Sequence, residues 1–272
     1  MHMTKSEMKS ISIIIPVFNE EKRLGKTFKA LKELKLPRGL KLEEVIFVDD
    51  GSNDKTFSML GQFRRTNILP VVIISYKSNK GKGYAVKRGV LEAKGDFILL
   101  FDADISTAFS ELKKFMKHIK NGENVIIGTR KNGHSTVVKH QPRIREVLGR
   151  GFTIFTQKAL SMKVTDFTCG FKLFSKKAYR KIFKASQING WGYDAEIIYL
   201  ANKYGYKIRE VAVIWSNDNA TKVVLYKAIP RSVYEILKIV VVHRFNKPKL
   251  KIKIPMLTIT LPKYIKSLNL VK

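Results

Sequence analysis

The first half of the chain alternates short apolar runs with stretches of helical periodicity, and this alternation restricts the fold more than any other feature. The runs are rich in Val, Ile and Phe and have the length of buried strands; they are residues 11–17, 45–48, 71–75, 97–101 and 125–128. Leu24, Phe28 and Leu31 recur at helical spacing, and residues 82–93 predict a further helix. Alternating strands and helices predict an α/β fold with a Rossmann-like, mostly parallel sheet and helices on both faces.

The second half is predicted to add two helices, at residues 143–161 and 191–204, and a strand at residues 207–215. In the N-terminal half, Asn19 is predicted to be the N-cap of the helix that contains Leu24, with acidic residues in its first turn. No linker, repeat or low-complexity segment divides the chain.

The composition limits the classes of partner. The sequence has 52 Lys and Arg against 22 Asp and Glu, a formal net charge of +30, which favours nucleic acid, anionic lipid or a phosphorylated substrate. No nucleic-acid-binding module is recognisable, so nucleic acid is not expected as a partner. A single cysteine, Cys169, excludes an intrachain disulfide and indicates a reducing compartment. Neither a signal peptide nor a membrane span is expected, because the N-terminus lacks an apolar region and the apolar runs are far shorter than ~20 residues.

Acidic or glycine-rich clusters lie at or just after the ends of four predicted strands, at residues 16–20, 49–52, 79–83 and 102–104. Ligands of parallel α/β sheets bind at the carboxyl ends of the strands, so these loops predict a ligand site at that edge. Each loop alone is also typical of an ordinary turn or helix cap, but four at one sheet edge are hard to explain as turns.

Asp102 and Asp104 follow a buried strand and are two residues apart, so in extended backbone their carboxylates point the same way. Two carboxylates with open coordination positions suit Mg²⁺ or Mn²⁺ that substrate phosphates also hold. The alternative, a solvated acidic turn, is the commoner fate of an isolated Asp-x-Asp. The shortage of acids in this chain favours the metal site.

The segment Gly81-Lys82-Gly83 precedes a predicted helix and is suited to approach phosphate, which places Lys82 among the expected binding residues. Neither Gly-x-x-x-x-Gly-Lys-Ser/Thr nor Gly-x-Gly-x-x-Gly occurs, and this excludes phosphate-loop NTPases and dinucleotide dehydrogenases. A nucleotidyltransferase is disfavoured because the loop after the first strand reads Phe18-Asn-Glu-Glu instead of being rich in glycine and arginine.

In order, the segments Pro-Val-Phe-Asn-Glu, Val-Asp-Asp-Gly-Ser-Asn-Asp, Asn-Lys-Gly-Lys-Gly and Asp-Ala-Asp resemble the family-2, inverting glycosyltransferases of the GT-A fold. Residues 166–174, Asp-Phe-Thr-Cys-Gly-Phe-Lys-Leu-Phe, are similar to a signature of the polyprenyl-phosphate sugar transferases in that family. Residues 102–110 and 191–196 favour the dolichyl-phosphate β-glucosyltransferase group. Ile105 and Phe167 depart from it, since the group usually has glycine and threonine there.

The resemblance implies transfer of a sugar, expected to be glucose, from a nucleoside-diphosphate sugar to a polyprenyl (dolichyl) phosphate with inversion, assisted by Mg²⁺ or Mn²⁺. A mannosyl- or N-acetylglucosaminyl-type enzyme of the same group stays open as an alternative, as does a polysaccharide-directed family-2 glycosyltransferase. The last normally has a Gln-x-x-Arg-Trp motif and transmembrane helices, which this sequence lacks.

Matched positions imply roles on the donor side. Asp104, with Asp102 and the donor diphosphate, is expected to hold the metal, and Lys222 lies near the donor phosphates. Lys82 and Asp102 are also expected to bind the donor. The residues expected to hold its nucleoside are Pro16, Phe18, Glu20, Asp49 and Asp50.

On the acceptor side, Arg130 and Arg145 match basic residues directed toward the acceptor phosphate, and Asp166 matches a proposed catalytic carboxylate. A lipid monophosphate has a second pKa of about 6, so it is mostly dianionic at neutral pH and needs little deprotonation. Asp166 is then expected to orient groups, whereas a hydroxyl acceptor would need it as a base. A structural role as a cap or ion-pair partner is an equally strong alternative for Asp166.

The resemblance ends near Lys222, which predicts a GT-A catalytic domain at residues 1–222 and a basic, amphipathic C-terminal segment at residues 223–272. From Lys222 onward there are 12 Lys and Arg and one acid, Glu235. Residues 225–245 are too charged to span a bilayer but suit the plane of an anionic membrane surface. The alternative is that they cover the sheet with their charges solvated. The expected location is cytoplasmic, peripheral on the cytoplasmic face of a membrane.

Overall fold

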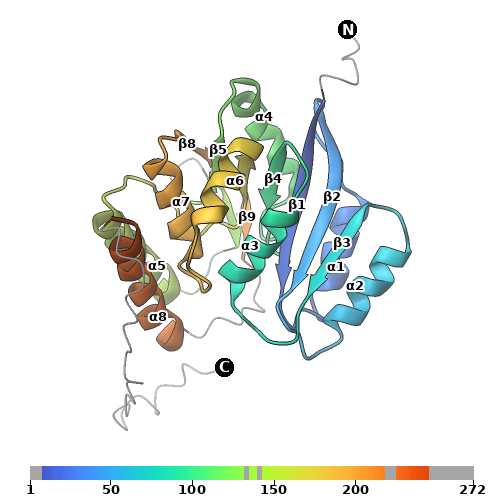
Figure 1. The fold of residues 1–272 in the computed structure, drawn as a ribbon, viewed down its shortest axis with the longest axis horizontal. Coiled ribbons are helices and arrows are strands. Elements are labelled where there is room, and N and C mark those ends of the chain that lie inside the picture. Colours follow the sequence, from blue (N-terminus) through green and yellow to red (C-terminus); the bar gives the residue numbers. More distant parts are fainter. Residues whose placement is uncertain (1–7, 132–134, 140–142, 218–224, 245–272) are drawn as a thin grey trace.

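A seven-stranded sheet forms the centre of the molecule (Figure 1). The computed structural model describes residues 8–131, 135–139, 143–217 and 225–244. Across the sheet the strands follow one another as β3 (Val71–Ser75), β2 (Leu40–Asp49), β1 (Lys9–Val17), β4 (Phe97–Leu100), β7 (Lys172–Ser175), β5 (Val125–Thr129) and β8 (Ile208–Ala212). Only β7 runs antiparallel to its neighbours β4 and β5 within this sheet. The predicted mostly parallel sheet is therefore confirmed.

Helices cover both faces of the sheet, as predicted, and each face has its own apolar core. Helices α1 (Leu24–Lys32), α2 (Thr56–Arg65) and α4 (Leu112–Lys120) pack on one face. The other face is covered by α3 (Lys82–Glu92), α6 (Lys176–Ala185) and α7 (Tyr193–Lys203), with the ends of α5 (Arg143–Leu160) and α8 (Leu225–Ile239). The described residues also include a 3-10 turn at Phe109–Glu111 and a π-helix at Val240–Arg244.

Strand β1 shows why the sequence builds two layers. Ile13 and Ile15 belong to the core under α1, whereas Ile14 belongs to the core under α3, and all three are fully buried. Side chains alternate between the faces of a strand, so a continuous run of β-branched residues fills both cores at once.

The predicted strand at residues 207–215 is wrong in its second part. Strand β8 ends at Ala212, and the chain then forms β9 (Trp215–Ser216), which pairs in parallel with β6 (Val137–Lys139) in a separate two-stranded sheet. The pairing partner changes between Val213 and Trp215. The Val213 amide still donates to the carbonyl of Thr129 in β5, whereas the Trp215 amide donates to the carbonyl of residue 136. This turn brings the Trp215 ring to the site described below.

The predicted N-cap at Asn19 is also wrong. Helix α1 begins at Leu24, and Asn19 adopts a left-handed φ of 53°. Its side-chain oxygen accepts a hydrogen bond of 2.8 Å from the amide of Asn53, and its own amide donates to the Ser52 hydroxyl at 2.9 Å. Asn19 thus connects the loops after β1 and β2 instead of starting a helix.

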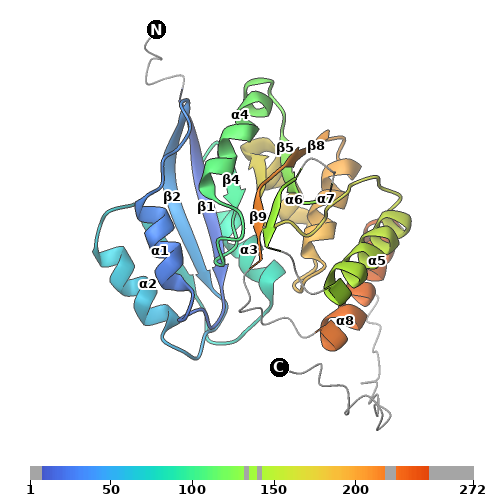
Figure 2. The same cartoon turned by 180° about the vertical axis from the view of Figure 1, so that it is seen from behind.

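Helices α5 and α8 lie side by side at one end of the molecule, far from α2 (Figures 1 and 2). From α8, Ile236 and Ile239 are fully buried in the core under α7. The described part of the predicted C-terminal segment therefore packs along one face against the preceding helices. Among the described residues, no helix combines the length and apolar character needed to cross a membrane.

Candidate active site

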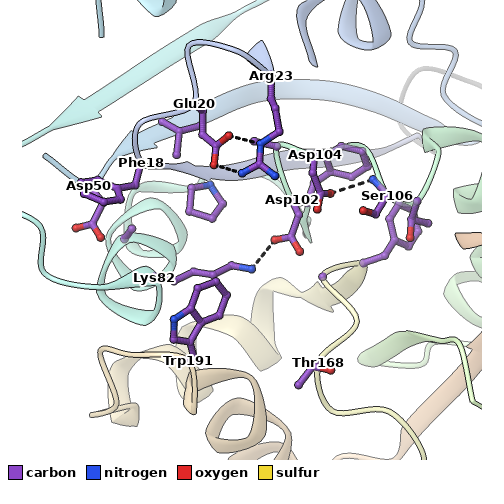
Figure 3. A pocket seen from close by; sticks show the side chains of 18 of the residues that line it. Phe18, Glu20, Arg23, Asp50, Lys82, Asp102, Asp104, Ser106, Thr168 and Trp191 are labelled. Carbon is purple, nitrogen blue, oxygen red and sulfur yellow. Dashed lines mark hydrogen bonds and ion pairs between the residues drawn. The ribbon is translucent and has the colours of Figure 1, made fainter. Parts of the chain in front are cut away.

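A cavity of about 500 Å³ lies at the carboxyl ends of the parallel strands, where the sequence predicts a ligand site. Loops after β1, β2, β3 and β4 form one side of it, and residues from β5 onward form the other. Figure 3 shows both sides facing each other across the space between Lys82, Asp102 and Thr168. Of the predicted site residues, those that line the cavity are Pro16, Phe18, Glu20, Asp50, Lys82, Asp102, Asp104 and Arg130.

Asp50 connects the end of β2 to the glycine-rich loop that begins α3. Its carboxylate accepts hydrogen bonds from the Tyr76 hydroxyl (2.7 Å), Asn79 Nδ2 (2.9 Å) and the amides of Lys80 and Gly81 (2.8 and 2.9 Å). Burial and this carboxylate raise the pKa of Tyr76 well above its usual value, so the phenol stays a donor. Asp50 thereby fixes the backbone from which Lys82 extends.

Asp49, the neighbouring predicted residue, is not among the residues that line the cavity. It is buried, and its carboxylate accepts hydrogen bonds from the Ser52 amide at 3.0 Å and the Ser75 hydroxyl at 3.3 Å. These contacts join the ends of β2 and β3. Asp50 thus lines the cavity, whereas Asp49 lies behind it and joins two strand ends.

Asp102 and Asp104 project into the cavity from the loop after β4 (Figure 3). Lys82 Nζ lies 2.7 Å from Asp102 Oδ1, and the Ser106 amide donates to Asp104 Oδ1 at 3.0 Å. Burial raises the pKa of Asp104, and the adjacent Asp102 carboxylate raises it further. For Asp102, burial also acts to raise the pKa, but Lys82 outweighs it and lowers the pKa.

These two carboxylates fit a divalent cation. Hard cations such as Mg²⁺ prefer oxygen ligands and are commonly held by one or two carboxylates plus substrate phosphates. Two carboxylates that each make ionisation of the other less favourable would both be stabilised in their charged form by a cation between them. Within the described ranges, no group of three or more His, Cys, Asp or Glu side chains could hold a metal alone. Substrate phosphates and water are the usual further ligands of such a cation.

Arg23 also lines the cavity, although it is not among the predicted site residues. Its guanidinium forms two parallel contacts with the Glu20 carboxylate, Nε–Oε2 and Nη2–Oε1, each 2.5 Å (Figure 3). Arg23 also occupies the position before α1. The i, i+3 spacing from Glu20 is the signal that indicates this pair in the sequence.

Arg130 reaches the cavity from the end of β5 and is oriented by Asp166. The Asp166 carboxylate is fully buried and accepts from Arg130 Nε at 2.7 Å, Nη2 at 2.9 Å and the Arg130 amide at 3.1 Å. Burial acts to raise the pKa of Asp166, but Arg130 outweighs it and holds the pKa far below its usual range. A carboxylate this acidic and this enclosed suits a positioning role more than proton abstraction.

Aromatic residues complete the second side of the cavity. The Trp215 ring lies 5.2 Å from Arg130 Cζ, and the Trp191 ring lies 5.3 Å from Lys82 Nζ. Both rings line the cavity, although core positions are what tryptophan most often indicates in a sequence. Arg231 of α8 also lines it, and no local motif indicates this residue. Lys222 and the side chain of Arg145 lie outside the described part of the chain.

Comparison with known proteins assigns the chain to a family. Residues 12–183 match the model of glycosyl transferase family 2. The chain belongs to glycosyltransferase family 2. It is 34% identical over 240 residues to a dolichyl-phosphate beta-glucosyltransferase of Dictyostelium discoideum, covering 84% of this chain and 73% of the relative. The human protein of the same name is 29% identical over 230 residues, covering 80% and 71%.

Solved structures show the same fold. Glucosyl-3-phosphoglycerate synthase of Mycobacterium tuberculosis, crystallised with Mn²⁺, UDP and glucosyl-3-phosphoglycerate, aligns with a TM-score of 0.63 at 17% identity, covering 89% of this chain and 82% of that one. TarS of S. aureus, in complex with UDP, aligns with a TM-score of 0.55 at 17% identity, covering 88% and 67%. The predicted GT-A fold and glycosyltransferase class are confirmed.

Proposed function

We propose that this family-2 glycosyltransferase transfers glucose from UDP-glucose to a dolichyl or other polyprenyl phosphate, with inversion at the anomeric carbon. The observation that carries the proposal is a single cavity with an Asp102/Asp104 pair on one side and the oriented guanidinium of Arg130 on the other. Such a cavity suits two phosphorylated substrates. The similarity to dolichyl-phosphate beta-glucosyltransferases supports the choice of sugar and acceptor.

At the donor end, Asp102 and Asp104 would hold Mg²⁺ or Mn²⁺, which neutralises negative charge on the departing nucleoside diphosphate. Lys82 supplies a second positive charge at the start of α3, where a helix N-terminus also favours anions. Pro16, Phe18 and Glu20 line the cavity at the end of β1 and would contact the nucleoside. Asp50 holds the neighbouring glycine-rich loop. Lys222 stays a predicted donor-phosphate ligand.

At the acceptor end, Arg130 would bind the lipid phosphate, and Arg145 is predicted to join it. A phosphate dianion is already a nucleophile at neutral pH, so the reaction needs no strong base. Asp166 then serves by holding the Arg130 guanidinium in a fixed orientation, with both its oxygens directed to that residue. In this assignment Asp166 contributes to acceptor binding without transferring a proton.

We also propose that α5 and α8 dock the enzyme on an anionic lipid surface. Val147, Leu148 and Ile154 of α5 are 67%, 39% and 53% exposed, and Leu237 of α8 is 50% exposed. Exposed apolar side chains on a strongly basic protein suit peripheral binding to anionic head groups. The single cysteine agrees with the cytoplasmic face of a membrane as the working location. In this view residues 1–222 form the catalytic domain and residues 223–272 assist docking.

A donor screen tests the reaction. UDP- and GDP-sugars are incubated with a polyprenyl phosphate, with and without Mn²⁺, and glycolipid formation is measured. We expect turnover with UDP-glucose and Mn²⁺. Turnover with GDP-mannose but not with UDP-glucose would reject the sugar assignment, and transfer to a soluble acceptor alone would reject the lipid.

Co-sedimentation with anionic vesicles tests the docking. We expect binding that weakens with salt and with the double substitution Val147→Asp and Ile154→Asp. Phe57→Asp is a matched control, because Phe57 is 53% exposed on α2, at the other end of the molecule (Figure 1). Absence of wild-type binding at low salt, or equal losses in the control, would contradict the docking surface.

A further inference from the structure

A short loop, residues 187–192, forms a wall of the cavity and lies between helices α3 and α8. On the α3 side, the amide of Tyr84 donates to the carbonyl of Asn189 at 3.2 Å. A Cβ atom added to Gly81 or Gly83 would overlap a carbonyl oxygen of the loop. Two backbones are thus in direct contact, so a displacement of the loop would disturb the start of α3.

On the α8 side, the loop rests on Glu235. The amide of Gly192 donates to Glu235 Oε2 at 2.7 Å in a buried hydrogen bond. A Cβ atom on Gly190 would overlap the same carboxylate, and Glu235 is only 7% exposed. Glu235 is also the one acid in the sequence from Lys222 to Lys272. A buried carboxylate in a basic segment therefore meets the loop where only glycine backbone fits.

A second buried acid holds the beginning of the loop. Glu196 is fully buried, and its carboxylate accepts from the amides of Gln187 at 2.7 Å and Ile188 at 2.9 Å. His243 Nε2, from the π-helix that continues α8, lies 2.7 Å from the same carboxylate. The C-terminal helical segment therefore supports the loop at both ends.

The loop carries a side chain that reaches the donor end of the site. Trp191 stands beside the Lys82 ammonium, which pairs with Asp102 (Figure 3). Contacts thus run from Glu235 through the loop to the lysine and to the predicted metal carboxylate. Two sets of contacts connect Glu235 to this pair, one through Trp191 and one through the backbone of Gly81.

We propose that Glu235 is a positioning residue for the nucleotide donor. By fixing the loop, it sets where Trp191 and Lys82 stand relative to the donor diphosphate. The inference rests on the proposed function, since it takes the cavity beside Lys82 to hold a nucleoside diphosphate. It adds a residue of the C-terminal segment to the donor site.

The test compares Glu235→Ala with Glu235→Gln. The KM values for UDP-glucose and for polyprenyl phosphate are measured separately, and the Kd for UDP with Mn²⁺ is measured by calorimetry. We expect Glu235→Ala to raise both donor constants about tenfold, which corresponds to about 1.4 kcal/mol, with the acceptor KM changed less than twofold. Glu235→Gln recovers most of the affinity, because its amide oxygen can still accept from the Gly192 amide.

Glu44→Ala is the matched control. Glu44 of β2 is 4% exposed and accepts hydrogen bonds of 2.8 Å from the Ser12 hydroxyl and the Lys94 amide. Lys94 precedes β4, so these contacts lie away from the carboxyl ends of the strands, where the cavity is. We expect it to lower the melting temperature without changing the donor constants. If Glu235→Ala lowers stability in the same way and leaves the UDP Kd unchanged, Glu235 is only structural and the proposal fails.

Gly190→Ala is an independent variant if Glu235→Ala does not fold. It keeps the carboxylate but displaces the loop from it, so the same rise in the UDP Kd is expected; an unchanged Kd overturns the proposal. A wild-type protein that binds UDP but transfers no glucose would reject the proposed function while the Kd comparison still decides the role of Glu235. Failure to bind UDP would reject both.

Discussion

The two sides of the cavity are built in different ways. On the N-terminal side, Asp50, Lys82, Asp102 and Asp104 follow the ends of parallel strands, and hydrogen bonds between adjacent loops hold them. On the C-terminal side, buried carboxylates behind the surface hold the groups that line the cavity, as Asp166 holds Arg130. On the N-terminal side Asp102 and Asp104 are partly exposed in the cavity, whereas Asp166 on the C-terminal side is fully enclosed. Substitutions should therefore affect chemistry on one side and both stability and binding on the other.

The largest effect is expected at Asp104. Asp104→Ala removes a predicted metal ligand, and loss of several kcal/mol of transition-state stabilisation should reduce the transfer rate by about 10³-fold or more. Because Asp104 makes a local hydrogen bond and its pKa is already raised, the free energy of unfolding should change little. Transfer rates and thermal melting check this.

Glu92→Ala is the control for Asp104, because Glu92 is an exposed acid at the end of α3 that pairs with Arg88. It should keep full activity. Full activity of Asp104→Ala with the fold intact, or of the wild type in EDTA, would contradict the metal role.

The next effect tests the enclosed side. Asp166→Asn breaks a buried ion pair and leaves the Arg130 charge without its partner, so the free energy of unfolding should fall by about 3 kcal/mol. The acceptor KM should rise, because the guanidinium loses its fixed orientation, and the donor KM should not. A loss of kcat with unchanged stability and unchanged acceptor KM would instead indicate that Asp166 is a base.

The pH dependence gives a second reading of Asp166. Its pKa is lowered in the folded protein, so its contribution to stability is present above the ordinary pKa of an Asp carboxyl, near 4, and is lost as the pH falls toward the folded value. The difference in unfolding free energy between wild type and Asp166→Asn should therefore be full at neutral pH and shrink below about pH 4. Urea titrations at several pH values measure it. A difference that grows in acid would contradict the ion pair.

The two sides also differ in how well sequence predicts them. The predicted ends of strand β3 are the observed ones. Asp102 and Asp104 can be predicted as cavity residues because the apolar pattern shows where β4 ends. Strand patterns and the residues after them are local signals. Glu235 contacts Gly192 across 43 positions, and Arg231 reaches the cavity from a helix with no motif of its own. Such contacts depend on how α8 packs. The error at Asn19 has the same origin, since hydrogen bonds to the next loop override its preference for a helix cap.

A smaller effect on donor and metal binding is expected at Lys82, whose ammonium group is itself a cation on the N-terminal side of the cavity. Lys82 Nζ pairs with Asp102 at 2.7 Å, so it competes with a metal for that carboxylate. Lys82→Met should bind Mn²⁺ severalfold more tightly in the absence of nucleotide while raising the donor KM. Electron paramagnetic resonance of free Mn²⁺ measures the first. Lys80→Met, at an exposed position near the Tyr84 ring, should leave both constants unchanged, and weaker Mn²⁺ binding by Lys82→Met would contradict the competition.

The smallest effect is expected at Ile105, directly after the metal carboxylates. Ile105 has a φ of 54°, a left-handed conformation that costs a β-branched residue roughly 1–2 kcal/mol and that glycine adopts without strain. Glycine is the residue that the sequence resemblance leads us to expect at this position, and this backbone conformation would suit it. Ile105→Gly should relieve the strain, but Ile105 is also partly buried against the core under α1, and glycine gains more freedom in the unfolded chain. We expect these opposing terms to leave the free energy of unfolding within about 1 kcal/mol of wild type, measured by urea denaturation. A loss above about 2 kcal/mol would show that packing of the side chain outweighs the backbone strain, and that the metal loop depends on core contacts as the enclosed side does.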